Sequence, residues 1–170
     1  MIALKNILVG TDFSEPSAVA LNYGRDLARS YGSTLHVVHV IEDLLALHGP
    51  EIGFAIADVE RNIEAAVRRD LDAAITPSDL DTLDVRTTIT RAPNASHAIT
   101  DYAKHNAIDL IIVGTHGRDA FHRFLIGSVA ERVMRTAPCP VLTVRAHERD
   151  FINSDANDHA GIDPVEEAHM

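Results

Sequence analysis

The sequence has little of what secreted and membrane-embedded proteins rely on. Cys139 is the single cysteine among 170 residues, which excludes an internal disulfide framework and indicates a reducing compartment. No run approaches the roughly 18 uninterrupted apolar residues of a membrane-spanning helix. The apolar stretch at the N-terminus is too short for a signal peptide and has no cleavage-like site of small residues. The sequence therefore predicts a cytoplasmic location without membrane insertion.

Positive charge is also scarce. The net charge is −10 at pH 7, and Lys5 and Lys104 are the only lysines. Because neutralising phosphates needs a basic face, this balance argues against nucleic acid as a partner. Residues 146–170 hold seven acidic residues against one arginine and show no periodicity. We predict a single globular domain over 1–146, followed by a flexible acidic tail over 147–170.

Five short runs with strand character define the fold class. They lie at 4–10, 33–42, 84–90, 109–114 and 140–145. Four of them are rich in Leu, Ile and Val, and 84–90 alternates apolar and polar residues. Strands that are apolar on both faces indicate a parallel sheet covered on both sides. With helices predicted between the strands, the sequence indicates a single doubly wound α/β domain.

Three of the predicted helices have clear boundary signals. The first has an N-cap at Ser14 and a stop at Gly32. Pro93 is predicted to open the third helix, and the fourth covers 128–136.

The second predicted helix begins at Asp58. Apolar residues recur there at every fourth position, so one side of the helix is predicted to face the core. Residues 43–57, just before it, show no clean period and are predicted to form a loop or lid. The repeating apolar positions are Val59, Ile63, Val67, Leu71 and Ile75.

The glycines after the fourth strand form the most informative local pattern. Gly114 ends the strand, Gly117 follows after two residues, and Gly127 follows after nine more, directly before Ser128. Ligands of open α/β sheets bind beyond the carboxyl ends of the strands, and glycine lets a ligand approach bare backbone. Unpaired N–H groups at the start of the next helix favour an anion. Together these features, with Arg118 between them, indicate a site for a phosphate chain.

A purely structural interpretation of the same residues stays open. Ser128 and Glu131 form the S-x-x-E pattern of a capping box, which would explain the serine without a ligand. Gly114 and Gly117 are also common turn residues. Asp12, just past the first strand, could accept hydrogen bonds from a ribose or could cap the following helix. Neither G-x-x-x-x-G-K-[ST] nor a G-x-G-x-x-G after the first strand is present.

Four stretches together resemble the universal stress protein family in its nucleotide-binding form. They are "ILVGTDFSEPSAVAL", "LHVVHVIE", "DLIIVGTHGR" and "LIGSVAERVMRTAPCPVLTVR". The family's signature is Gly, two residues, Gly, nine residues, Gly and then Ser or Thr, and the glycine loop matches it at every spacing. The resemblance covers residues 2–145. One departure is Arg91-Ala92-Pro93, where family members often have Gly-x-Pro.

The resemblance implies a Rossmann-like fold, similar to the adenine nucleotide alpha hydrolases, with strand order 3-2-1-4-5. ATP, or AMP or ADP, would lie between strands 1 and 4, where this order reverses direction. A divalent ion, Mg2+ or Mn2+, would arrive only with the phosphates. Asp12 would contact the ribose, while Thr11 and the backbone of Val40 would border the adenine. The residues implied near the phosphates are Gly114, Gly117, Arg118, Gly127, Ser128 and Val129.

The resemblance also implies a homodimer, formed by antiparallel pairing of the fifth strands of two chains. In the implied order this strand lies at the edge of the sheet, and an apolar edge needs covering. Its residues are Val141, Leu142, Thr143 and Val144.

The histidines and the cysteine are less informative. His36 and His39 fall on opposite faces of a strand, because side chains alternate there. His116 and His122 in the glycine loop are the one pair to consider for a metal, but no carboxylate or cysteine stands at ligand spacing, so solvated imidazoles are preferred. Cys139 is predicted to be a small buried hydrophobe.

No catalytic set of side chains is visible in the sequence. We therefore predict an ATP-binding stress or regulatory protein whose nucleotide acts as a conformational ligand for an unidentified protein partner. Three alternatives stay open: a slow ATPase or phosphotransferase at the same site, a nucleotide-free dimeric adaptor, and a flavodoxin-like FMN carrier. The placement of the glycines after the fourth strand argues against the FMN carrier.

Overall fold

The computed structural model describes residues 2–42, 53–115 and 126–146, with residues 53–58 described by their backbone alone. Strands and helices alternate along the chain. The strands are β1 (Asn6–Gly10), β2 (Thr34–Glu42), β3 (Val85–Ala92), β4 (Leu110–Gly114) and β5 (Val141–Val144). The helices are α1 (Glu15–Tyr31), α3 (Gly53–Ala74), α4 (Pro77–Thr82), α5 (Ala95–His105) and α6 (Ser128–Thr136).

The five strands form one sheet in the order β3-β2-β1-β4-β5. Every neighbouring pair is parallel, and β1 lies between β2 and β4, with Gly10 opposite Val38 on one side and Val113 on the other. The predicted doubly wound α/β fold and its strand order are confirmed. The order reverses between β1 and β4, which places a crevice beyond their carboxyl ends.

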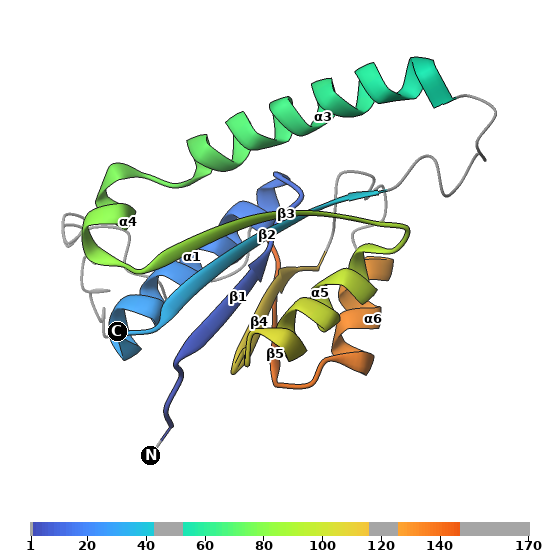
Figure 1. Cartoon of the computed structure of the whole chain (residues 1–170). Helices are drawn as coiled ribbons and strands as arrows, with labels where there is room; N and C mark the ends of the chain where they lie inside the picture. The colour runs from blue at the N-terminus through green and yellow to red at the C-terminus, as the bar shows by residue number, and fades with distance from the viewer. Residues whose placement is uncertain (1, 43–52, 116–125, 147–170) are drawn as a thin grey trace, which may run out of the picture.

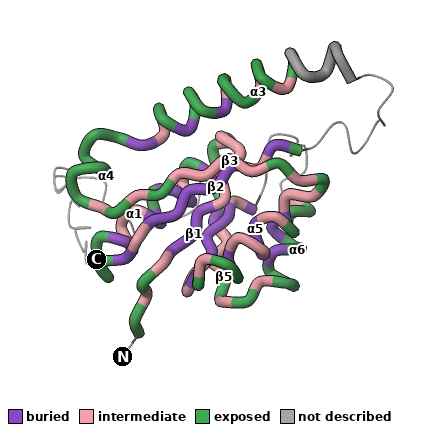
Figure 2. The backbone as a smooth tube through the Cα atoms, in the orientation of Figure 1, coloured by how far each residue is buried: buried purple, intermediate pink, exposed green. Residues whose placement is uncertain are grey.

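Helices cover both faces of the sheet (Figure 1). Side chains alternate along β1, so Ile7 and Val9 face the layer formed by α1 and α3, whereas Leu8 faces α5 and α6. In Figure 2 the central strands are mostly buried, whereas much of α3 is exposed. Two apolar layers therefore hold the sheet, and each fully buried Leu or Ile contributes about 1.5–3 kcal/mol relative to leaving it exposed.

The first helix has the predicted boundaries. Ser14 is the N-cap residue of α1, and Gly32 ends the helix in the left-handed conformation with φ at 66°. Glycine is suited to this position because it has no Cβ to crowd the backbone.

The predicted loop over 43–57 is wrong in its last part. Residues 43–52 lie outside the described residues, but α3 already begins at Gly53. The expected core side of this helix is also only partly correct. Val67, Leu71 and Ile75 are buried, whereas Val59 is 49% exposed. The period of four predicted the helix, and burial along this repeat increases from exposed Val59 through half-buried Ile63 to buried Val67.

The short helix α4 was not predicted from the sequence. Its N-cap Thr76 and Asp79 form a capping box, in which each side chain accepts a hydrogen bond from the other residue's backbone N–H. Asp79 is 1% exposed and also accepts hydrogen bonds from Arg25 and Arg29 of α1, each at 2.9 Å. One carboxylate thus both starts α4 and fastens it to α1.

The third predicted helix begins later than Pro93. Asn94 is the N-cap of α5, and its side chain accepts a hydrogen bond from the backbone N–H of His97. Proline fixes the backbone before the cap, and asparagine supplies the acceptor that the first turn needs.

Among the helices within the described residues, none combines the length and the apolar character that crossing a membrane requires. The predicted acidic tail at 147–170 lies outside the described residues, so the domain boundary at residue 146 stays a prediction.

Candidate functional site

The candidate site lies where the chain leaves β1 and β4 on the same side of the sheet. Both strands are parallel and adjacent, and β4 ends at Gly114 opposite Val144 of β5. Thr11 continues the ladder past the end of β1, since its N–H donates to the carbonyl of Val38 at 3.0 Å. The turn after β1 and the residues after β4 therefore start side by side at the point where the strand order reverses.

The turn from β1 into α1 is held by its own side chains. The Thr11 hydroxyl accepts a hydrogen bond from the N–H of Phe13 at 3.1 Å. Oδ1 of Asp12 accepts from both the N–H and the hydroxyl of Ser14, at 3.1 and 2.5 Å. Asp12 is therefore not the cap of α1. It orders the turn that leads to the N-cap, Ser14, and its half-buried carboxylate keeps a fixed direction.

Gly114 has a structural reason to be glycine. A Cβ built there would lie 2.9 Å from the carbonyl carbon of Pro16 and 3.0 Å from the amide nitrogen of Ser17. Hence the first turn of α1 packs directly against the end of β4. The sequence attributed this glycine to a ligand or to a turn, whereas the structure shows close helix packing at the same point.

The N-terminus of α6 lies beside the end of β4. The N–H of Gly127 donates to the carbonyl of Thr115 at 2.5 Å, so the two ends of the glycine loop meet. Gly127 is the N-cap residue, no side chain caps the helix, and Ser128 is the first helical residue. The alternative interpretation of Ser128 and Glu131 as a capping box is therefore wrong.

This one-residue difference changes what Ser128 does. The side chains of Ser128 and Val129 are exposed, the latter at 37%. The first intrahelical hydrogen bond runs from the N–H of Glu131 to the carbonyl of Gly127. The N–H groups of the three preceding residues point along the helix axis without an intrahelical acceptor, as at any helix start. These residues are Ser128, Val129 and Ala130.

Val40 lies on β2, two residues beyond the point where β1 ends beside it. It pairs with Thr90 of β3 and is half-buried against the layer formed by α5 and α6. Its backbone is thus at the same carboxyl edge as the turn after β1.

The structure brings most of the expected nucleotide contacts to one edge of the sheet. Gly117 and Arg118, and the histidine pair His116 and His122, lie outside the described residues. The residues that do gather there are Thr11, Asp12, Val40, Gly114, Gly127, Ser128 and Val129.

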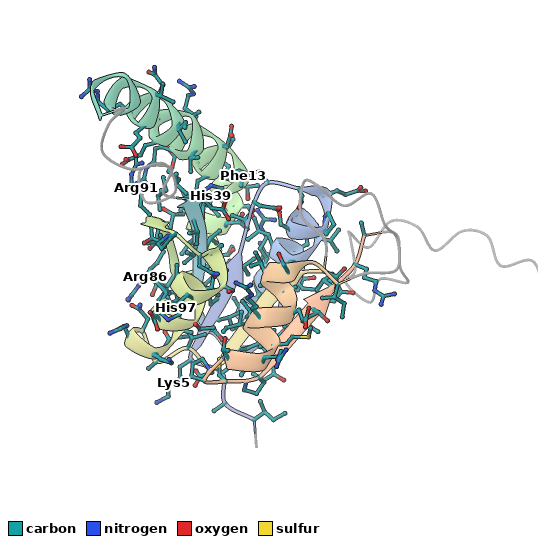
Figure 3. The ribbon with its side chains drawn as sticks, turned by 90° about the vertical axis from the view of Figure 1, so that its right-hand side faces the viewer. Lys5, Phe13, His39, Arg86, Arg91 and His97 are labelled. Carbon is teal, nitrogen blue, oxygen red and sulfur yellow. The ribbon has the colours of Figure 1, made fainter. Side chains whose placement is uncertain are left out.

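Two residues at this edge were missed by the sequence reasoning. Phe13 has a positive φ of 62°, which is rare for a residue other than glycine. Its ring stacks on His39 of β2, with ring centroids 4.7 Å apart, and Figure 3 shows the two side chains next to each other. No local pattern signals this contact, because β2 and the turn are far apart in the sequence.

The other histidine of β2 belongs to the opposite face, as predicted. His36 is buried and its Nδ1 lies 2.9 Å from the hydroxyl of Tyr102 on α5. Burial lowers the pKa of His36, and the charge of Arg86 lowers it further, so the ring is neutral near pH 7. Cys139 is only half-buried rather than fully buried, and burial raises the pKa of its thiol.

An open hollow of about 350 Å³ lies between α5 and the carboxyl end of β3, two strands away from β1. Its charged groups are paired with one another or with α3. Asp101 lies near His97 and Lys104, and Arg91 near Glu60 and Glu64. Within the described ranges, no group of three His, Cys, Asp or Glu side chains is placed to hold a metal ion.

Comparisons with known proteins agree with this fold. A model of the universal stress protein family matches residues 3–145. Universal stress protein A homolog 1 of Coxiella burnetii is 32% identical over 145 residues, which cover 82% of this chain and 95% of that protein.

Two solved structures extend the comparison. The universal stress protein UspA from Lactobacillus plantarum is 27% identical with a TM-score of 0.71, covering 85% of this chain and 100% of that one. The universal stress protein from Archaeoglobus fulgidus in complex with dAMP is 23% identical with a TM-score of 0.58, covering 85% and 99%. Since the family model covers almost all of the described residues, the chain belongs to the universal stress protein family.

Proposed function

We propose that this protein binds an adenine nucleotide, with ATP as the leading candidate, in the crevice between β1 and β4. The observation that carries the proposal is the position of the α6 N-terminus. The hydrogen bond from Gly127 to Thr115 holds the unpaired amides of Ser128, Val129 and Ala130 at the end of β4. Amides at a helix start, with the positive end of the helix dipole, favour a phosphate.

Ser128 strengthens this anion site. Because Gly127 is the N-cap, the Ser128 hydroxyl is not used to cap α6 and is exposed at the helix start. It can donate a hydrogen bond to a phosphate oxygen beside its own amide. Gly117 and Arg118 are proposed to complete the phosphate contacts from the loop between Thr115 and Gly127.

The other end of the nucleotide is proposed to lie over β1 and β2. Asp12 would accept hydrogen bonds from the ribose hydroxyls through its ordered carboxylate, as acidic residues do in dinucleotide-binding folds. Thr11 and the backbone of Val40 would border the adenine. Mg2+ or Mn2+ would enter with the phosphates.

The dAMP complex of the Archaeoglobus fulgidus protein supports the choice of an adenine nucleotide by analogy. At 23% identity this likeness shows the fold alone, so the residues named above carry the proposal.

We propose further that the nucleotide acts as a conformational ligand in a cytoplasmic stress or regulatory protein. A nucleotide that contacts both the turn after β1 and the start of α6 would favour one relative arrangement of these two segments. Following phosphate release from bound ATP tests whether the protein is a slow ATPase or phosphotransferase. The binding measurement below tests the nucleotide-free adaptor, which would bind no nucleotide.

Calorimetry on the full chain with ATP, AMP and FMN tests the proposal. The parent protein should bind ATP. Ser128→Ala should weaken ATP binding about tenfold or more, the effect of losing a hydrogen bond to a charged group. Asp12→Ala should weaken ATP and AMP by the same factor, since both contain the ribose. Gly117→Val should abolish ATP binding in a folded protein if its β-branched side chain fills the space of the phosphates.

Ser30→Ala is the matched control for Ser128→Ala. Ser30 is exposed near the end of α1, at the opposite edge of the sheet from the crevice. It should bind ATP like the parent. If Gly117→Val also binds ATP like the parent, the loop is only a turn and the nucleotide proposal is wrong.

A further inference from the structure

His39 contacts the residues on both sides of Asp12. Its Nδ1 lies 2.9 Å from the carbonyl oxygen of Thr11, and its ring stacks on Phe13 at 4.7 Å with an angle of 18° between the planes. A carbonyl oxygen only accepts hydrogen bonds, so Nδ1 of His39 donates and must bear the hydrogen. One side chain of β2 thus holds the peptide before Asp12 and the side chain after it.

Both contacts act on a turn that the chain would not adopt unaided. Phe13 has φ at 62°, a conformation that costs free energy in residues with a side chain and persists only when the surroundings impose it. His39 is itself 9% exposed, so it is fixed within the sheet and the overlying layer. The stacked ring and the hydrogen bond therefore supply part of what keeps the strained turn in place.

The next residue along β2 adds a second connection. Val40 is the residue whose backbone is proposed to border the adenine, and it follows His39 directly. The same short segment of β2 therefore contacts the proposed adenine site through its backbone and the proposed ribose site through His39. Figure 3 places His39 and Phe13 together, with Lys5 toward the opposite end of the sheet.

We propose that His39 is a positioning residue for ribose recognition. It orients the Asp12 carboxylate by holding Thr11 and Phe13, and it does not itself touch the nucleotide. This inference rests on the proposed adenine nucleotide site and adds the residue that gives the site its preference for ribose hydroxyls.

The test compares ATP with 2′,3′-dideoxy-ATP, which lacks the hydroxyls that Asp12 would bind. Parent protein should prefer ATP. His39→Phe keeps a ring for Phe13 but removes the donor to Thr11, so ATP should bind about tenfold more weakly. Binding of the dideoxy nucleotide should stay unchanged, which removes the preference. His39→Asn, whose amide nitrogen can take the place of Nδ1, should keep most of the preference.

His36→Phe is the matched control, because it makes the same substitution in the same strand on the opposite face. It should change thermal stability without changing the preference for ATP. If His39→Phe does not fold, Phe13→Leu carries the same test, since it removes the ring on which His39 stacks. Circular dichroism of each variant separates folding from binding.

Three outcomes would overturn the assignment. If His39→Phe weakens the binding of both nucleotides by the same factor, His39 only supports the fold. If it keeps the parent's preference, His39 has no part in ribose recognition. A parent protein that binds neither nucleotide overturns the proposed function, and this inference with it, so the two failures are distinguishable.

Discussion

Gly114 combines a packing requirement with a place in the candidate site. Its position at the end of β4 is also where Pro16 and Ser17 of α1 come closest, at 2.9 and 3.0 Å from the point that a Cβ would occupy. Both neighbours are backbone or ring atoms, so they cannot turn aside as a flexible side chain would. The first turn of α1 and the end of β4 can therefore approach only if residue 114 is glycine.

Gly114→Ala should lower the free energy of unfolding by about 1–3 kcal/mol, the cost of forcing extra atoms into packed surroundings. Urea denaturation measures it. Gly32→Asn is the control, because no atom lies within 4 Å of a Cβ at Gly32 and asparagine tolerates the left-handed conformation there. A Gly114→Ala protein as stable as the parent would show that α1 moves aside without cost.

Ser128 is a second residue whose role depends on a single position along the helix. Because Gly127 caps α6, the Ser128 hydroxyl contributes no capping hydrogen bond. Ser128→Ala should therefore leave the free energy of unfolding within about 0.5 kcal/mol of the parent, as for surface substitutions without a structural partner. A loss near 1 kcal/mol in urea denaturation would instead indicate the capping box.

At the scale of elements, α4 depends on one buried carboxylate. Burial alone would raise the pKa of Asp79, but hydrogen bonds from Thr76 and Arg25 and the charge of Arg25 hold it below its ordinary value of 3.8. The ionised form is therefore the one that joins α4 to α1. Arg25 also donates to the carbonyl of Ala74 at the end of α3, so the same cluster fixes the connection between α3 and α4.

Asp79→Asn should lower the free energy of unfolding by about 2–3 kcal/mol at pH 7, because it leaves Arg25 without its charged partner. The pH dependence should change as well. A lowered pKa stabilises the folded state fully above the unfolded value of 3.8, and this contribution disappears as the pH falls through the lower folded-state pKa. Parent stability should therefore fall more steeply with acid than that of Asp79→Asn.

Asp84→Asn is a control for this measurement, since its pair with Arg86 is exposed on both sides at 61%. Exposed pairs contribute little, so its acid profile should follow that of the parent. Urea denaturation from pH 7 down to about pH 3 compares the three proteins. Identical acid profiles for Asp79→Asn and the parent would contradict a stabilising charge at Asp79.

At the scale of the whole molecule, the sheet has two edges, β3 and β5. We propose that β5 pairs with the same strand of a second chain. Val141, Leu142 and Thr143 are half-buried within one chain. The carbonyl of Pro140 accepts from the N–H of Ile111, and the carbonyl of Val144 accepts from the N–H of Thr115. Because backbone groups alternate along a strand, those of Val141 and Thr143 point outward, away from β4.

Thr143→Pro should convert the proposed dimer into a monomer without unfolding it, because proline removes an outward N–H and leaves the pairing with β4 intact. Light scattering at micromolar concentration measures the mass. Thr87→Pro is the control, because it makes the same change at the other edge strand, β3. The carbonyl of Asp84 accepts from Leu35 of β2, so by alternation the backbone groups of Thr87 point away from β2. Thr87→Pro should leave the mass unchanged. A monomeric parent would contradict the dimer.

Local patterns of this sequence were enough to predict the five strands, every described helix except α4, and the class of fold. The five apolar or alternating runs became the five strands, and runs apolar on both faces require a covered parallel sheet. The resemblance supplied the strand order. Given that order, Asp12, Gly114 and the start of α6 had to gather at one edge, because the carboxyl ends of parallel strands share a side.

Only the tertiary structure decided the details on which the site depends. The S-x-x-E pattern fits a helix whose N-cap is Ser128, but the structure has Gly127 as the N-cap, held by its hydrogen bond to Thr115, so the helix begins at Ser128 itself. Thr76 and Asp79 form a local capping box, but only the tertiary structure brings Arg25 and Arg29 of α1 onto the buried carboxylate. Likewise, Phe13 adopts a positive φ beside His39 of β2. Each of these depends on groups distant in the chain, which the spacing of nearby residues does not record.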